Sequence, residues 1–398
     1  MTLQPRALAT YLAARVLPAL ATMCLTFLCI HALPPEQYAT YSLTLLAAGV
    51  AAGFVGGVSG QAMLRYSHEL SPEALRRGLF GFPLLAAALA CPLVLVYLWW
   101  TSGWSAAALL ATAAIPALAV MDTRRSLFIA AGRADAVFKL DAARAGLALL
   151  LAFALLQGWG AHAAAPLLAQ WLAVVACLLL VRPLRTTPSI AGTREVDAQY
   201  LGYGVGIAGW MAVIVALSLA ERSVVAGTIG LADSGRYAAQ ADVINAVFSA
   251  AAGALGAAMM PAYLAQSRSL EAAALRRLLR LGLVGVLAIA LLCLLLGALL
   301  SLAGLGRVSQ ALTGDPRTAI TLVAAGAVWA AAGFVQKPIE LRGQTYRLFA
   351  GVIVALGLFL LVAPTLAERA GPSGVALAKL IAGGLYCIIA FIAAREPR

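Results

Sequence analysis

The chain has 398 residues, of which 63% are hydrophobic and 11% charged, and its mean hydropathy is +0.94. A soluble domain carries roughly 25% charged residues because it must solvate its surface. A soluble protein is therefore excluded, and an integral membrane protein is indicated. The formal net charge of +12 is placed at the edges of apolar segments, which argues against a nucleic-acid partner. The six cysteines lie in apolar runs without a CxxC pair, so neither a disulfide framework nor a metal site is predicted.

Apolar runs, taken in chain order, predict an all-α polytopic membrane protein with about twelve transmembrane helices. A span needs about 20 apolar residues to cross a hydrocarbon core of about 30 Å. The first run contains Arg15 and continues to about residue 32, which is too long for a secretory signal, so an uncleaved span is expected. The twelve expected spans are 8–31, 40–63, 79–99, 104–121, 142–157, 163–182, 201–220, 237–262, 279–303, 318–335, 346–366 and 373–393.

Two polar turns between apolar runs resemble each other. They are "LPPEQYATYSLTL" at 33–45 and "LADSGRYAAQADV" at 231–243. Laying Tyr38 over Tyr237 gives an offset of 199 residues, which is half of the 398-residue chain. The repeat predicts that each half of the chain folds in the same way.

The repeat divides the chain into two pseudo-symmetric six-helix bundles in the same orientation, at 1–200 (with a cytoplasmic linker, 183–200) and at 201–398. This is a transporter plan with the substrate path between the halves. Of the 28 Lys and Arg residues, 21 fall on the side of the termini and five on the other. The positive-inside rule therefore predicts that both termini are cytoplasmic.

Two glycine patterns have contrasting interpretations. "GVGIAG" at 204–209 matches a dinucleotide fingerprint, but that fingerprint follows a strand, and this copy lies inside an expected span. Gly49, Gly53 and Gly57 form a stripe at four-residue spacing, which favours close helix packing in lipid. No nucleophile and base pair, phosphate loop or metal cluster is present, so the chain is not expected to be an enzyme or to hold a cofactor.

Charged residues inside spans are costly and point to function. Arg15 lies about 10 Å into the first span by helix rise and is either a snorkelling anchor or a cavity residue, and Lys379 lies deeper in the last span. Glu221 and Arg222 end the seventh span, and Asp242 lies in the eighth. Adjacent residues on a helix do not face each other, so Glu221 and Arg222 are not simply one ion pair. Asp242 either couples transport to an ion or caps a helix start.

The turn "LPPEQYATYSL", the glycine-rich span that ends in "GQAMLRYSHEL", and "ERSVVAGTIGLADSGRYAAQADVI" in the second half together resemble a known family. They are similar to the polysaccharide transporters of the multidrug/oligosaccharidyl-lipid/polysaccharide (MOP) flippase superfamily. Ala39 stands where that family usually has glycine, and Glu221 stands where an aspartate is common.

The resemblance implies an O-antigen-type flippase that moves an undecaprenyl-diphosphate-linked oligosaccharide to the periplasmic leaflet of a bacterial inner membrane by alternating access. Basic side chains would neutralise the diphosphate, and the candidates are Arg15, Arg65, Lys379 and Arg222. Asp242 and Glu221 are the candidates for coupling to a proton or sodium gradient. The expected partners of this monomer are the polyprenyl-diphosphate-linked glycan, the lipid bilayer, and a polysaccharide polymerase with other assembly proteins.

Two alternatives remain open. A multidrug exporter of the same superfamily needs a buried carboxylate, and the first bundle is expected to have none because Asp122, Asp135 and Asp141 fall in a loop after the fourth span. A non-transporting membrane component of a polysaccharide assembly complex is the second alternative.

Overall fold

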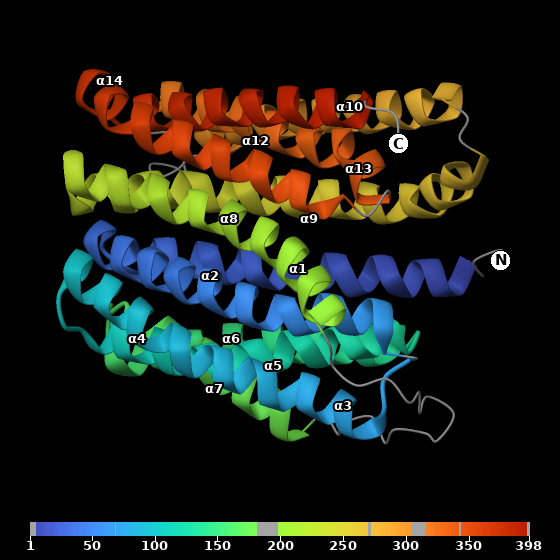
Figure 1. Cartoon of the computed structure of the whole chain (residues 1–398). Helices are drawn as coiled ribbons and strands as arrows, with labels where there is room; N and C mark the ends of the chain where they lie inside the picture. Colours follow the sequence, from blue (N-terminus) through green and yellow to red (C-terminus); the bar gives the residue numbers. More distant parts are fainter. Residues whose placement is uncertain are drawn as a thin grey trace. The chain divides into compact units, whose positions relative to one another are not determined.

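The computed structural model describes residues 5–67, 69–180, 198–269, 272–303, 315–341 and 344–395. Within these ranges, the side chains of residues 5–17, 102, 134, 198–199, 253–254, 256–269, 272–278, 296, 300–303 and 341 lie outside this description. Every regular element in these ranges is helical (Figure 1). The helices are α1 (Pro5–Ala32), α2 (Pro35–Tyr66), α3 (Pro72–Arg76), the π-helical η1 (Arg77–Gly81), α4 (Phe82–Ser102), α5 (Ala106–Ala130), α6 (Ala134–Trp159), α7 (Ala164–Leu180), α8 (Ala198–Thr228), α9 (Leu231–Ser269), α10 (Ala272–Ala303), α12 (Pro316–Val335), α13 (Lys337–Leu341) and α14 (Thr345–Arg395). The all-α prediction is confirmed.

The helices pack into two compact units. Unit 1 comprises Met1–Leu25 and Thr40–Leu219, and unit 2 comprises Thr26–Ala39 and Ala220–Arg398. Within unit 1, α5 packs against α4, α6 and α7, and within unit 2, α12 packs against α9, α10 and α14. Helices α1, α2 and α8 each contribute residues to both units. The predicted division into bundles at residue 200 stays a prediction.

Eight helices in the described ranges are long and apolar enough to cross a membrane, and two shorter apolar segments, Pro18–Ala32 and Ala164–Leu180, accompany them. The last of the eight lies in the 51-residue helix α14, which is kinked at Gly371 with φ +61°. Glycine tolerates this left-handed conformation at no steric cost. The expected spans 346–366 and 373–393 lie on the two sides of this kink. The count of twelve spans stays a prediction.

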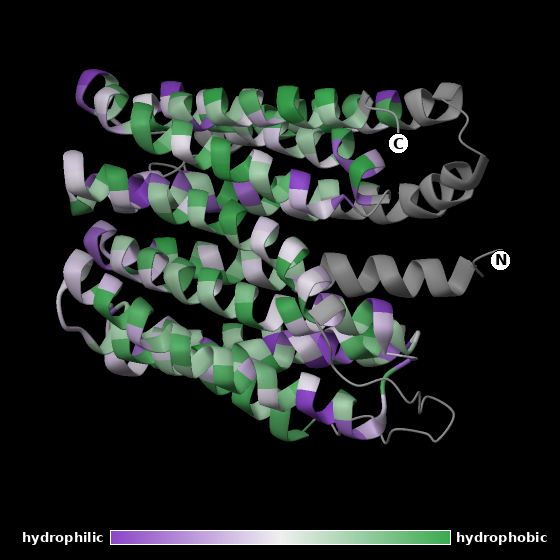
Figure 2. Cartoon of the chain, viewed as in Figure 1, coloured by the Kyte–Doolittle hydropathy of each residue, from purple (hydrophilic) through white to green (hydrophobic). Residues whose placement is uncertain are grey.

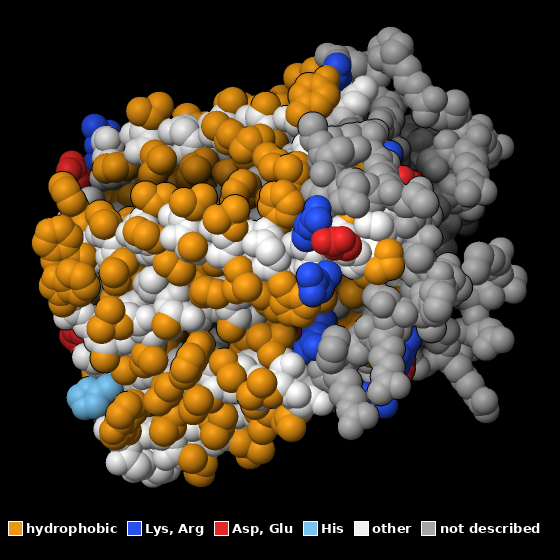
Figure 3. All heavy atoms as spheres, turned by 60° about the horizontal axis from the view of Figure 1, so that its bottom comes forward, with side chains coloured by type: hydrophobic (Ala, Val, Ile, Leu, Met, Phe, Trp, Pro, Cys, Tyr) orange, Lys and Arg blue, Asp and Glu red, His pale blue; other side chains and the backbone are white. Residues whose placement is uncertain are grey.

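Apolar side chains lie along the outside of the helices, as lipid contact requires. Figure 2 shows long hydrophobic stretches in the described helices of both units, and hydrophobic side chains cover most of the described face in Figure 3. On α4, Leu85, Leu89 and Leu93 are 63%, 69% and 73% exposed. Their four-residue spacing puts them on one face of the helix. A face of this kind is stable in hydrocarbon and not in water.

Glycines set the approach of α2 to α8 within unit 1. A Cβ atom added to Gly204 would lie 2.2 Å from the backbone oxygen of Val58, and one added to Gly57 would lie 3.0 Å from the Ala208 side chain. The "GVGIAG" segment therefore serves helix packing, as small residues do in membranes.

The structure corrects the expected loop after the fourth span. Helix α5 continues to Ala130, Gly132 makes the turn with φ +69°, and α6 starts at Ala134. Asp122, Asp135 and Asp141 are therefore all helical, with Asp135 in the first turn of α6. A charged residue lowers the local hydropathy and so suggests the end of a span. The helix can nevertheless continue when an oppositely charged residue on the neighbouring helix pairs with it. Here Arg125 Nε donates to Asp141 Oδ2 over 2.7 Å.

Candidate functional site

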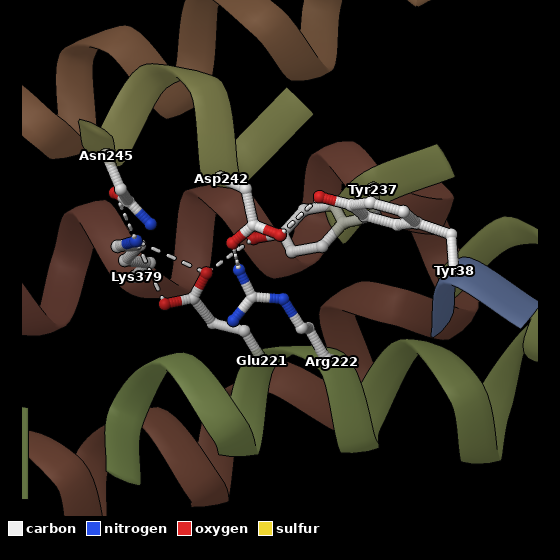
Figure 4. Close-up of polar contacts among 7 residues, drawn as sticks. All are labelled: Tyr38, Glu221, Arg222, Tyr237, Asp242, Asn245 and Lys379. Atoms are coloured by element: carbon white, nitrogen blue, oxygen red, sulfur yellow. Dashed lines mark hydrogen bonds and ion pairs between the residues drawn. The ribbon is translucent and has the colours of Figure 1, made fainter. Parts of the chain in front are cut away.

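A cluster of charged and polar side chains lies inside unit 2 (Figure 4). Four of its members are charged, namely Glu221 and Arg222 on α8, Asp242 on α9 and Lys379 on α14. Two tyrosines and an amide complete it: Tyr38 from the first turns of α2, and Tyr237 and Asn245 from α9. The sequence-predicted candidates Glu221, Arg222, Asp242 and Lys379 are thus brought together.

Glu221 is fully buried and forms the first half of the cluster. Lys379 Nζ lies 3.0 Å from Glu221 Oε1 and donates to Oε2 over 3.3 Å. The hydroxyl of Tyr237 donates to the same Oε2 over 2.9 Å. Lys379 Nζ also donates to Asn245 Oδ1 over 3.4 Å. One carboxylate therefore joins three helices.

Asp242 is the centre of the second half. Arg222 Nη2 forms an ion pair with Asp242 Oδ1, and the hydroxyl of Tyr38 donates to Asp242 Oδ2 over 2.8 Å. The Arg222 side chain is 1% exposed and that of Asp242 is 27% exposed. Asp242 lies eleven residues beyond Leu231, the start of α9, so it is three turns from the helix end and does not cap it.

The neighbouring residues Glu221 and Arg222 take different partners, because side chains one residue apart on a helix point in different directions. Two acids and two bases give the cluster no net formal charge. Burying four charges carries a desolvation penalty of several kcal/mol per ion, which a close ion pair with further hydrogen bonds offsets. This arrangement is stable only while each partner stays in place.

The cluster belongs to one half of the repeat. At an offset of 199 residues, Glu221, Arg222 and Asp242 correspond to Thr22, Met23 and Leu43, which are uncharged. The two tyrosines that revealed the repeat, Tyr38 and Tyr237, instead both donate to carboxylates of the same cluster. In the sequence, these two tyrosines were distinguished only by their equivalent positions in the two copies of the repeat.

Asn245 follows Asp242 by three residues on α9, and this spacing places both on one helix face. The sequence did not single out Asn245, because an uncharged amide inside a span costs less free energy to bury than a charged side chain does.

The other two basic candidates lie elsewhere. Arg65 is near the end of α2 and exposed, and its guanidinium lies 4.7 Å from the ring centroid of Tyr203 and 5.4 Å from that of Tyr66. A cation held over an aromatic face keeps its N–H groups available at the edge. Arg15 is on α1, and its side chain lies outside the description.

No group of three or more His, Cys, Asp or Glu residues that could hold a metal ion occurs in the described ranges. The two carboxylates of the cluster form ion pairs with an ammonium and a guanidinium, and each accepts a hydrogen bond from a tyrosine hydroxyl. Such a site can exchange protons or ions at its carboxylates and change its internal pairing.

No protein-family model matches the chain, and no curated protein matches it in sequence. Solved structures are similar in fold. The lipid II flippase MurJ in an inward closed conformation is 12% identical at a TM-score of 0.74, over 99% of this chain and 88% of MurJ. The Vibrio cholerae MATE transporter VcmN is 14% identical at a TM-score of 0.70, over 99% of this chain and 97% of VcmN.

A MOP superfamily transporter from Pyrococcus furiosus is 12% identical at a TM-score of 0.62, over 98% of this chain and 94% of that one. Sequence identities this low support a similarity of fold and no conclusion about function. The chain is an all-α, multi-pass membrane protein with the fold seen in transporters of the MOP superfamily.

Proposed function

We propose that the protein is a transporter that flips a polyprenyl-diphosphate-linked oligosaccharide across a bacterial inner membrane. Two six-helix bundles, 1–200 and 201–398, would alternate access to a path between them. Both termini would be cytoplasmic, and the substrate would be the repeat unit of an O-antigen, capsule or exopolysaccharide. The proposal stands on the buried charge network of unit 2 in a chain with a transporter fold.

The network fits a coupling device. Intramembrane ionisable residues are expensive and mark ion, proton or substrate pathways. Glu221 is paired with Lys379, and Asp242 is paired with Arg222. Binding of a proton or sodium ion at either carboxylate would therefore free its cationic partner from the ion pair. Asp242, with 27% of its side chain exposed, is the more accessible of the two. We therefore assign ion entry to Asp242 and the structural half of the device to Glu221.

An anionic substrate suits the basic character of the chain. The formal charge is +12, and Arg65 presents a guanidinium that is exposed and held over Tyr203. Arg pairs with phosphate through a planar fork of donors. We assign contact with the diphosphate to Arg65 together with Arg15, whereas Arg222 and Lys379 serve the carboxylates until the network opens. The lipid II flippase MurJ has a similar fold.

A cation exporter is the second candidate, because a buried acid does exist in unit 1. Asp141 is 5% exposed, contrary to the expected loop position. Its pairing with Arg125 at 2.7 Å weakens it as a site for a cationic drug. If the protein is a multidrug exporter that binds its cationic substrate at Asp141, the Asp141→Asn variant is expected to lose efflux activity.

The deciding experiment uses a strain that lacks this gene and carries plasmid copies of the wild type, Arg65→Gln or Asp242→Asn. Loss of long-chain surface glycan, with lipid-linked oligosaccharide accumulating on the cytoplasmic face, is expected for the deletion and both variants. Arg77→Gln is the matched control, because Arg77 is exposed and its ion pair with Glu73, one turn away on the helix, is also exposed.

A deletion strain with normal glycan and no accumulated intermediate would refute the flippase. A change in dye efflux instead would establish the exporter. Intact glycan in a triple Arg15, Arg65 and Lys379 neutralisation would indicate a non-transporting assembly component.

A further inference from the structure

Unit 1 contains a cavity of about 310 Å³ between α1, α2, α5, α6 and α7. A volume near 300 Å³ is at the small end of the range for ligand-binding pockets. Most of its wall is apolar, with Leu45, Leu118, Leu167 and Trp171 among the lining side chains. The cavity lies apart from the charge network, since all its lining residues belong to unit 1.

Arg144 is the one charged residue in the lining of this cavity. It lies ten residues beyond Ala134, the start of α6, or about 15 Å along the helix by the rise per residue. Its Nε is buried without a hydrogen-bond partner. Within the described part of the chain, the Arg144 side chain makes neither a hydrogen bond nor an ion pair. A guanidinium has five N–H donors, so this one has unused capacity.

The nearby acids do not neutralise Arg144 by direct contact. Asp141 is already paired with Arg125 at 2.7 Å. Asp122 attracts Arg144 electrostatically, without a hydrogen bond between them. Arg144 is partly buried, and an anion in the cavity could form the direct, charge-assisted hydrogen bonds that Asp122 and Asp141 do not form with it.

The second polar group in the wall is Gln170. Its Nε2 donates to the hydroxyl of Tyr41 over 2.8 Å, which fixes the amide in place. The cavity thus offers one fork of cationic donors and one oriented amide on an otherwise apolar wall. A ligand that matches this wall has one anionic head and an apolar remainder.

We propose that this cavity binds the phosphate group of an amphiphile, with the phosphate against Arg144 and the apolar part against the leucine-lined wall. Arg recognises phosphate bidentately, with two parallel N–H···O bonds. Two sources share this chemistry: a polyprenyl diphosphate and a membrane phospholipid. Nothing in the proposal requires that the protein flips its ligand, so it stands independently of the proposed function.

The test is binding to purified full-length protein in a phosphate-free detergent solution. The probes are farnesyl diphosphate, inorganic pyrophosphate and phosphatidylglycerol, and binding is followed by calorimetry. Wild-type protein is expected to bind farnesyl diphosphate more tightly than pyrophosphate, because only the former fills the apolar wall. Competition by phosphatidylglycerol would assign the site to a phospholipid, and its absence would assign it to the diphosphate.

The variants separate charge from volume. Arg144→Gln is expected to weaken binding about 10- to 100-fold, which corresponds to the loss of about 1.5 to 3 kcal/mol from a charged hydrogen bond. Ala148→Leu puts extra volume into the cavity wall and is expected to weaken binding while Arg144 stays. Arg77→Gln, outside the cavity, is the control and is expected to bind like the wild type.

Three outcomes would overturn the proposal: no binding of any probe by the wild type, unchanged binding in Arg144→Gln, or unchanged binding in Ala148→Leu. Should Arg144→Gln not fold, Arg144→Lys replaces it, because it keeps the charge and loses the fork. A glycan-export defect has no bearing on these measurements, since they need no transport. Failure of the cavity proposal and failure of the flippase are therefore distinguishable.

Discussion

Replacing Lys379 with methionine tests the buried ion pair most directly. Methionine keeps an unbranched side chain of similar length and removes the ammonium. In the wild type, Nζ lies 3.0 Å from Glu221 Oε1, and the two side chains are 6% and 0% exposed. At an effective dielectric constant of about 20, two unit charges at this distance attract each other by about 5 to 6 kcal/mol. The variant leaves Glu221 with the hydrogen bond that the Tyr237 hydroxyl donates over 2.9 Å.

Lys379→Met is expected to lower the free energy of unfolding by about 3 to 5 kcal/mol, because breaking a buried pair leaves one charge uncompensated. The double variant Lys379→Met with Glu221→Gln removes both charges and is expected to lose clearly less than the sum of the two single changes. The assay is reversible denaturation of purified protein in mixed micelles, run as a double-mutant cycle. Transport is measured separately in the strain that lacks the gene.

Lys337→Met is the matched control for this cycle. Lys337 is also in unit 2 and pairs with Glu340 at 2.6 Å, but the two side chains are 24% and 26% exposed. A pair with this much solvent contact is worth about 1 kcal/mol or less. The reasoning is refuted if Lys379→Met costs no more than Lys337→Met, or if the double variant loses the full sum.

Three further predictions concern contacts of α2 and of its partners. Gly235→Ala is expected to destabilise the protein by about 1 to 3 kcal/mol, because the new Cβ would lie 1.9 Å from the backbone oxygen of Pro35; thermal unfolding in detergent measures this. Gly204→Ala is expected to cost a similar amount through its 2.2 Å approach to the Val58 oxygen, measured in the same way. Tyr38→Phe is expected to cost about 1.5 to 3 kcal/mol for a hydrogen bond to a charged group and to reduce glycan export.

Two glycines serve as controls for these substitutions. A Cβ atom at Gly202 or at Gly227 would meet no atom of another described segment within 4 Å. Alanine at these helical positions is expected to be neutral or to stabilise the protein by up to about 1 kcal/mol, following helix propensity. Equal destabilisation at Gly202 and Gly204 would contradict the role assigned to close packing.

The membrane class and the helical fold could be predicted from the sequence because hydropathy is a local property. The charge network could be predicted only in part. Lys379 and Glu221 stand out as charges in apolar runs, but their pairing joins residues 158 positions apart, and no local pattern carries that information. Tyr38 was recognised as a repeated residue and not as a partner of Asp242, which is 204 positions away.

The expected loop at 122–141 shows the opposite failure. A hydropathy reading ends a span at the first cluster of charges, and Asp122 and Arg125 follow an apolar run directly. The helix continues because Arg125 finds Asp141 on the next helix, so the charges are matched inside the structure. Paired charges on two helices that follow each other in sequence are therefore a signal for longer helices. Arg144, three residues beyond Asp141, lies on the same helix α6.

Helix α2 is where a change at Asp242 can be passed along the chain. Its first residues, up to Ala39, belong to unit 2, and the rest, from Thr40, belongs to unit 1. The contacts of these first turns in unit 2 include the hydrogen bond from the Tyr38 hydroxyl to Asp242 and the close approach of Pro35 to Gly235. If the proposed function is right, a proton or ion that weakened the Arg222 pair would also alter the acceptor of Tyr38, at the start of α2. If Tyr38→Phe abolishes export while Asp242 still exchanges ions, the hydrogen bond of Tyr38 is needed for a step of transport other than ion binding.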